Sequence, residues 1–227
     1  MENKILLPRT TKEGKPRVSY SQVSLFNSKK SFNLGIEGEL EYIISYFLGH
    51  QLTPKFGGES WSSFGKDVEL YIGERERGEA FSIEEKEVLD TIEPLGVVST
   101  PFELDLGEFV LTGLIDDRLE DWSKIRDYKT ASKATKKQYE KDSYIQLDLY
   151  ALVALEKTGK IPKMEVCVIE RSGNGNKGGR DVLKVAGGVW YIEKTTTLER
   201  LRKLKEDIFE AVLGISNLYK TYLKYNK

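Results

Sequence analysis

Two carboxylates and a lysine lie close together in the segment GLIDDRLEDWSKIRDYKT, which covers residues 113–130. Asp116 follows the apolar residues 111–115, and Asp127 and Lys129 lie on the next expected strand, beyond a polar turn. Side chains alternate along a strand, so Asp127 and Lys129 project to one face and Tyr128 projects to the other. Pairing of the two strands would therefore bring two carboxylates and an ammonium group together.

Carboxylates held this close repel one another unless a cation lies between them, and hard oxygen ligands suit Mg²⁺ or Mn²⁺. Such an ion polarises a phosphodiester and lowers the pKa of a bound water, and Lys129 would orient the water or stabilise charge on the phosphate. The backbone carbonyl of Tyr128 is a natural further ligand. The segment predicts metal-dependent hydrolysis of phosphodiester bonds.

An acid followed two residues later by lysine is a weak signal by itself. The same spacing occurs at Glu13 and Lys15, in a polar arm, and at Glu84 and Lys86, on an expected helix. A solvated β-hairpin with surface charges is the alternative interpretation of residues 113–130. The strand context and the preceding Asp116 distinguish this segment from the other two.

The helix expected after this hairpin carries Gln146 and Tyr150, which are four residues apart and therefore share one face. An amide and a phenol on that face can contact a phosphate or hold a catalytic lysine in place. The alternative is a solvent-exposed Gln146 and a Tyr150 that belongs to the core.

Composition restricts the kind of metal site. The 227 residues include a single cysteine, Cys167, and a single histidine, His50, which excludes a disulfide framework, a Cys/His zinc site and a four-cysteine iron–sulfur cluster. Oxygen ligands remain. The 35 basic and 36 acidic residues give a net charge of -1, so nucleic-acid contacts must come from local patches. No apolar stretch approaches the roughly 18 residues of a membrane span, and a single cysteine suits a reducing compartment, so we expect a cytoplasmic protein.

The hydrophobic pattern changes along the chain between helical and strand spacing. We expect an extended N-terminal arm over residues 1–18 and a single domain over residues 19–227. Six helices are expected: one that begins at Ser19, one over 36–48, one from Ser62 or Ser63 to 76, and others over 82–92, 136–157 and 197–222. Five strands are expected, over 97–104, 108–116, 122–129, 163–171 and 181–192. This order indicates an α/β fold.

Taken in order, these segments resemble the RecB-like branch of the PD-(D/E)XK nucleases, which includes the nuclease domains of bacterial recombination helicases, Cas4-like proteins and phage exonucleases. The matching pieces are SYSQVSLFNSKKSF (19–32), FGKDVELYI (64–72), Gly113 to Asp116, Asp127 to Lys129 and QLDLY (146–150). The resemblance implies a restriction-endonuclease-like core, a mixed sheet flanked by helices. It also implies an exonuclease that acts on DNA ends.

The resemblance implies a metal site as well. Glu69, Asp116, Asp127 and the Tyr128 carbonyl would hold Mg²⁺ or Mn²⁺. Lys129 would activate or position the water, and Gln146 and Tyr150 would support the lysine and the phosphate. The sequence departs from the iron–sulfur members, because Ser28 stands where they have a cysteine. No helicase motif of the GxxxxGK[ST] type is present, so a helicase or recombination partner would be a separate protein.

The upstream ligand has two candidates, Asp67 and Glu69, which lie about 200° apart around a helix. Glu69 lies four residues after Gly65, as the family ligand does, and its longer side chain reaches further. We therefore predict Glu69.

Two other functions remain possible for the same fold: a non-catalytic nucleic-acid-binding or assembly protein, and an endonuclease. Basic side chains that could contact phosphates, or could simply be solvated, are Lys133, Lys136, Lys137, Arg171, Lys177 and Arg180. Trp61 and Trp122 could stack on bases or belong to the core.

Overall fold

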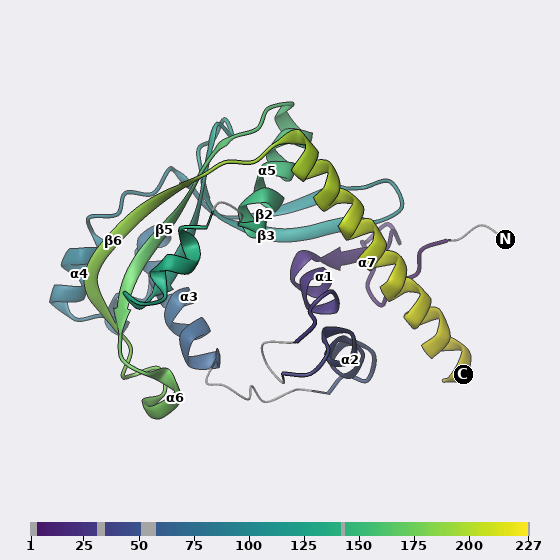
Figure 1. The fold of residues 1–227 in the computed structure, drawn as a ribbon, viewed down its shortest axis with the longest axis horizontal. Coiled ribbons are helices and arrows are strands. Elements are labelled where there is room, and N and C mark those ends of the chain that lie inside the picture. The colour runs from purple at the N-terminus through teal and green to yellow at the C-terminus, as the bar shows by residue number, and fades with distance from the viewer. Residues whose placement is uncertain (1–3, 31–34, 51–57, 142–143, 227) are drawn as a thin grey trace. The chain divides into compact units, whose positions relative to one another are not determined.

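The structure is a computed structural model that describes residues 4–30, 35–50, 58–141 and 144–226 (Figure 1). The chain forms two compact units. The central unit comprises residues 57–100 and 114–201, and the terminal unit comprises residues 1–56, 101–113 and 202–227. A six-stranded mixed sheet has the order β1-β3-β4-β5-β6, with β2 also paired to β3, and helices flank it. The predicted α/β core with a mixed sheet is confirmed.

The strands of the central unit place the acidic segment inside a sheet. β4 (Lys124–Ala131) pairs in parallel with β5 (Lys163–Ser172), and Asp127 lies opposite Val166. β5 continues antiparallel into β6 (Lys184–Lys194). On the other side of β4, β3 (Val110–Arg118) pairs antiparallel through Asp117 and Arg126. Parallel neighbours need a crossover, and α5 (Ile145–Thr158) provides it between β4 and β5.

Helices α3 (Gly58–Glu74) and α4 (Ile83–Leu89) cover one face of these strands; a short 3-10 helix, Gly78–Ala80, lies between them. Phe64, Val68 and Ile72 follow helical spacing along α3 and are fully buried. They share a hydrophobic core with Tyr128 of β4 and Cys167 of β5. Figure 1 shows α3 and α4 beside β5 and β6. Because the apolar side of α3 is fixed in this core, the positions of its polar residues relative to the sheet are fixed as well.

Helix α4 begins where the sequence predicts. Ser82 and Glu85 form a capping box, in which Ser82 Oγ accepts from the Glu85 N–H and Glu85 Oε2 accepts from the Ser82 N–H. The other Glu85 oxygen accepts a hydrogen bond of 2.8 Å from the backbone N–H of Val185. One buried carboxylate thus both caps α4 and attaches it to β6. The short helix α6 (Gly175–Gly178) lies in the β5–β6 connection.

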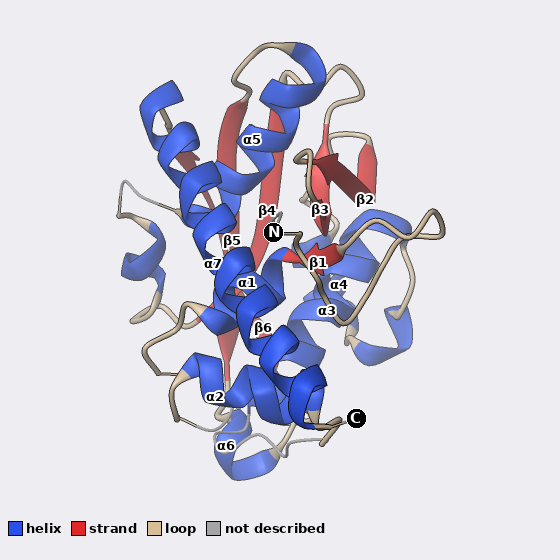
Figure 2. Cartoon of the chain, turned by 90° about the vertical axis from the view of Figure 1, so that its right-hand side faces the viewer, coloured by secondary structure: helices blue, strands red, loops and turns tan. Residues whose placement is uncertain are grey.

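The terminal unit contains β1 (Arg17–Ser19), α1 (Tyr20–Phe26), α2 (Gly38–Tyr42), a π-helical turn (Ile43–Phe47), and α7 (Leu198–Tyr225) from residue 202 onward. Figure 2 shows the helices and strands of the chain in a second view. Ser19 caps α1 in a capping box with Gln22. β1 pairs in parallel with β3, with Val18 opposite Leu111. In the segment predicted as an arm, Ile5 and Leu7 are buried. The division into an arm and one domain stays a prediction.

Three of the boundaries that differ from the predicted ones bear on the site. β2 (Val97–Asp105) matches closely, but β3 continues to Arg118, so Asp116 lies inside the strand and not at its end. The helix predicted over 136–157 is a 3-10 helix, Lys136–Tyr139, followed by α5 from Ile145. Lys194 of β6 donates hydrogen bonds to the carbonyls of Tyr139 and Lys141, which are then not available to a continuing helix. α3 begins at Gly58, before the predicted Ser62.

Residues 31 and 32, the last two of the motif at 19–32, lie outside the described residues. Across the described part of the chain, no helix combines the length and the apolar character that a membrane span needs.

Candidate active site

Lys129 lies among the oxygen atoms of the acidic segment. Its Nζ is 2.8 Å from each carboxylate oxygen of Asp127 and 3.0 Å from the Tyr128 carbonyl oxygen. It is also 3.9 Å from Oδ2 of Asp116. The antiparallel pairing of β3 and β4 brings these side chains together, because Asp116 and Asp127 lie on adjacent strands. The structure thus joins the three residues that the sequence singles out.

Burial shapes the charges of this group. The Asp127 side chain is fully buried, whereas that of Lys129 is 24% exposed. Burial raises the pKa of Asp127 to about 7, with the charge of Asp116 adding to the rise and that of Lys129 opposing it. For Lys129, burial lowers the pKa, but the charges of Asp127 and Asp116 outweigh it and raise the value well above the ordinary one. The ammonium therefore stays charged and offsets part of the buried negative charge.

Hydrogen bonds from two elements fix the Asp116 carboxylate. Its Oδ2 accepts from the backbone N–H of Tyr128 at 3.0 Å. Its Oδ1 accepts from the Tyr150 hydroxyl at 3.2 Å, and that hydroxyl accepts from Gln146 Nε2 at 2.7 Å. The predicted pair on one face of α5 therefore lies against the acids, and Tyr150 is 2% exposed. Their role in chemistry stays a prediction.

Tyr144 is a residue of this site that the sequence analysis missed. Its hydroxyl donates to Asp127 Oδ2 at 3.1 Å and lies 3.4 Å from Gln146 Oε1. On a continuous helix, residues 144 and 146 would point about 200° apart. The backbone at Tyr144 is extended instead, with φ -139° and ψ 97°, because it precedes α5 as the cap residue. A correct prediction of where α5 begins could have found Tyr144, but the predicted helix begins too early, at residue 136.

The two candidates for the upstream ligand have different surroundings. Burial raises the pKa of Glu69 to about 8, and the charge of Asp116 adds to the rise. Lys129 and Asp127 also act on this carboxyl, so Glu69 lies within the field of the acidic group. Asp67 instead accepts a hydrogen bond of 2.8 Å from Arg180 Nε. The structure therefore brings Glu69, and not Asp67, to the acids of the sheet.

A second polar network lies on the opposite side of β4, where Tyr128 points. The Tyr128 hydroxyl donates to Asp117 Oδ2 at 2.7 Å, and the same oxygen accepts from the Leu95 N–H at 2.8 Å. Arg126 pairs with Glu165 at 2.7 Å and lies 3.7 Å from Asp117. These buried contacts join β3, β4 and β5. They fix the register that places Asp116 beside the backbone of Tyr128.

The donor chemistry of the site fits a divalent cation. Three carboxyl groups and a carbonyl oxygen gather near one ammonium, so the site is rich in the hard oxygen donors that such an ion prefers. The Lys129 ammonium is itself a cation held among these oxygens. Within the described ranges, however, no three acidic, histidine or cysteine side chains surround a single point closely enough to hold an ion. The fit to a cation is therefore one of donor chemistry.

Several basic and aromatic side chains named from the sequence have partners within the protein. Arg180 pairs with Asp67, and Lys136 lies 3.2 Å from Glu140. The Arg171 guanidinium lies over the Trp61 ring, 5.3 Å from its centroid. Trp61 packs against the hydrophobic core of the central unit. Arg118 lies 4.1 Å from the centroid of the Trp122 ring. The role of these groups in DNA binding stays a prediction.

Comparisons with known proteins agree with this geometry. Residues 55–218, more than half of the chain, match the family described as the PD-(D/E)XK nuclease superfamily. A crystal structure from Eubacterium rectale, described as a "Putative exonuclease", is similar with a TM-score of 0.56 and 14% sequence identity. The similarity covers 92% of this chain and 87% of that one, and at this identity it shows the fold. None of the curated proteins matches the sequence.

Proposed function

Because the chain belongs to the PD-(D/E)XK nuclease superfamily, we propose that it is a Mg²⁺- or Mn²⁺-dependent deoxyribonuclease of the RecB-like branch that degrades DNA from its ends. Nucleases of this superfamily generally use divalent metal ions. The observation that supports the proposal most is the Lys129 ammonium held between Asp127, the Tyr128 carbonyl and Asp116. This combination of cation ligands and a positive group suits the hydrolysis of a phosphodiester.

Glu69, Asp116, Asp127 and the Tyr128 carbonyl would hold the ion. When bound, it would supply positive charge to the scissile phosphate and lower the pKa of the attacking water. Lys129 donates its N–H groups to the same region, where it would orient the water or stabilise charge on a phosphate oxygen. Hydrolysis forms one P–O bond to the water oxygen and breaks the P–O bond to the leaving strand, which takes up a proton.

Tyrosine hydroxyls would keep the carboxylates oriented. Tyr150 donates to Asp116 and Tyr144 donates to Asp127, so each aspartate retains one fixed oxygen. Gln146 donates to Tyr150 and thereby sets the direction in which that hydroxyl donates. Tyr144 would act through Asp127, whereas Gln146 and Tyr150 would also support Lys129 and the phosphate.

An exonuclease and an endonuclease differ in their need for a DNA end. Purified protein incubated with linear, nicked and closed circular DNA should degrade the linear form with Mg²⁺ or Mn²⁺ and leave the closed circle intact. The Lys129→Ala variant, purified in parallel, controls for a contaminating nuclease. Cleavage that continues in excess EDTA would contradict metal dependence, and cutting of the closed circle would identify an endonuclease.

The remaining parts of the proposal concern the cellular setting. We place the protein in the cytoplasm of a bacterial or phage-infected cell, in DNA recombination and repair. A helicase or recombination protein would act as a separate partner. A non-catalytic DNA-binding protein on the same fold is the alternative, and intact Asp116, Asp127 and Lys129 argue against it, since mere binding does not need two carboxylates beside a lysine.

A further inference from the structure

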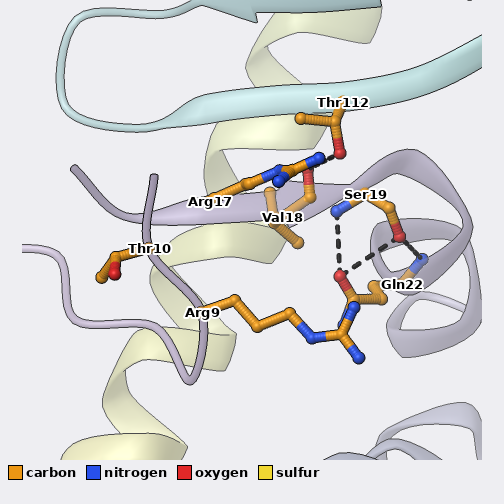
Figure 3. Close-up of a pocket in the computed structure, with 7 residues that line it drawn as sticks. All are labelled: Arg9, Thr10, Arg17, Val18, Ser19, Gln22 and Thr112. Atoms are coloured by element: carbon orange, nitrogen blue, oxygen red, sulfur yellow. Dashed lines mark hydrogen bonds between the residues drawn. The ribbon is translucent and has the colours of Figure 1, made fainter. Parts of the chain in front are cut away.

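A polar pocket of about 300 Å³ lies in the terminal unit (Figure 3). Its polar lining comes from the N-terminal segment, β1, α1 and β3, through Arg9, Thr10, Arg17, Ser19, Gln22 and Thr112. The volume is at the small end of the range for ligand pockets. The nuclease chemistry described above uses none of these residues, and the function of the pocket has to be argued from its own side chains.

The lining carries two guanidinium groups and no carboxylate. The acid beside Arg17 is Glu103, at 3.9 Å, and both side chains are largely exposed at 46% and 64%, so this pair is weak. No carboxylate among the described residues forms an ion pair with Arg9, whose guanidinium lies 5.9 Å from the centroid of the Tyr46 ring. In a protein with nearly equal numbers of acids and bases, the pocket is a local concentration of positive charge.

A buried amide adds a donor between the charged groups. Gln22 is 4% exposed, and its Oε1 accepts from the Ser19 N–H at 2.9 Å and the Ser19 hydroxyl at 3.1 Å. These bonds fix the amide, so its Nε2 points away from Ser19. In the described part of the chain, no acceptor is hydrogen-bonded to this Nε2. Figure 3 shows the Arg9 side chain extended toward Gln22, while Arg17 lies on β1 beside Thr112.

We propose that this pocket binds a phosphate group. Guanidinium groups form paired hydrogen bonds to phosphate oxygens, and the fixed Gln22 amide and the Thr10 hydroxyl supply further donors. A carboxylate has two acceptor oxygens, whereas a terminal phosphate has three and carries up to two negative charges, which matches two guanidinium groups. The phosphate belongs either to a nucleic-acid strand, in which case the inference rests on the proposed nuclease function, or to free phosphate.

Binding measurements on the full chain test the proposal. Arg9→Gln/Arg17→Gln removes both guanidinium groups, and Lys12→Gln/Lys29→Gln is the matched control, since both lysines are exposed and outside the pocket. The probes are inorganic phosphate and fluorescent oligonucleotides with a 5′-phosphate, a 3′-phosphate or no terminal phosphate. EDTA is present throughout to prevent cleavage. Thermal melting of each variant reports whether the fold is intact.

We expect the arginine variant to lose at least about fivefold in affinity for a phosphate-bearing probe, with the lysine control close to wild type. A loss confined to one phosphorylated end assigns the pocket to a strand terminus. An equal loss for all three oligonucleotides assigns it to backbone phosphate, and a loss for inorganic phosphate alone assigns it to free phosphate. Arg9→Lys/Arg17→Lys should bind with intermediate affinity, because charge remains but the paired donors are lost.

Unchanged affinity of a folded arginine variant for every probe overturns the proposal. So does an equal loss in the lysine control, which would indicate only the general charge of the surface. Failure of the phosphate-binding proposal is distinguishable from failure of the nuclease proposal. Chelator-sensitive cleavage without pocket binding would leave the nuclease intact, and phosphate binding without cleavage would leave the pocket intact.

Discussion

Arg180 Nε donates a hydrogen bond of 2.8 Å to Asp67 Oδ2, and this engages one of two neighbouring acids of α3. The other acid, Glu69, lies in the field of Asp116 and Asp127. We predict that Glu69→Gln loses at least about tenfold in cleavage rate, equivalent to roughly 1.4 kcal/mol of barrier, because it removes a metal ligand. Asp67→Asn is the matched control and should stay near wild type. Single-turnover assays at equal Mn²⁺ decide, and a loss in Asp67→Asn alone would reverse the assignment.

Lys129→Ala should abolish cleavage while metal and DNA binding persist, since the ammonium acts on water or phosphate and is not a ligand. Asp116→Ala and Asp127→Ala should instead weaken Mn²⁺ binding, because each removes a carboxylate from the cage. Calorimetry with Mn²⁺ and cleavage assays separate the two effects. Lys163→Ala, at an exposed lysine at the start of β5, is the control. Near-normal turnover of Lys129→Ala, or unchanged Mn²⁺ affinity in both aspartate variants, contradicts the assignment.

Tyr144→Phe removes the hydroxyl that donates to Asp127 Oδ2. Hydrogen bonds to charged groups contribute about 1.5–3 kcal/mol, so we predict a loss of roughly tenfold or more in cleavage rate. Tyr139→Phe makes the same chemical change on the neighbouring ring, 5.9 Å away between centroids, where no described carboxylate accepts from the hydroxyl. Equal rates in the two variants would show that Tyr144 only packs. An unchanged melting temperature and a normal Mn²⁺ affinity of Tyr144→Phe would point to the same conclusion.

Cys167 provides a probe of unfolding, because it is the single cysteine and is fully buried. Burial raises the pKa of its thiol to about 12, so at pH 8 the group stays protonated, and only the thiolate reacts with alkylating agents. We predict that the native protein resists iodoacetamide at pH 8 and that guanidinium chloride makes the thiol reactive. Mass spectrometry measures the labelled fraction over time. Rapid labelling of the native protein would show that β5 opens without global unfolding.

Local signals predicted the elements well. Helix α4 begins where a helix was predicted, and Ser82 and Glu85, three residues apart, form its capping box. The alternation of a strand likewise places Asp127 and Lys129 on one face. Such features depend only on residues that are close together in the sequence, so they can be predicted without knowledge of the tertiary structure. The same holds for Gln146 and Tyr150, which meet across one helical turn.

Long-range contacts account for what the sequence missed. The start of α5 depends on Lys194, which binds carbonyls more than 50 residues earlier in the chain. The position of Tyr144 beside Asp127 follows from that start and could not be read from spacing. The pairing of Asp67 with Arg180, which is 113 residues away, is another contact that the sequence does not show. The buried network of Asp117, Tyr128 and Arg126 is likewise visible only once the strands are paired.

The division of the chain limits how it can be shortened. Glu69 belongs to residues 57–100, and Asp116, Asp127, Lys129, Tyr144 and Tyr150 belong to residues 114–201, so the site is assembled from two sequence segments. The intervening residues 101–113 belong to the other unit. A continuous piece of the gene that encodes every site residue therefore always encodes part of β2 and β3 that packs elsewhere. Removing the termini would therefore leave residues 101–113 without the rest of their own unit.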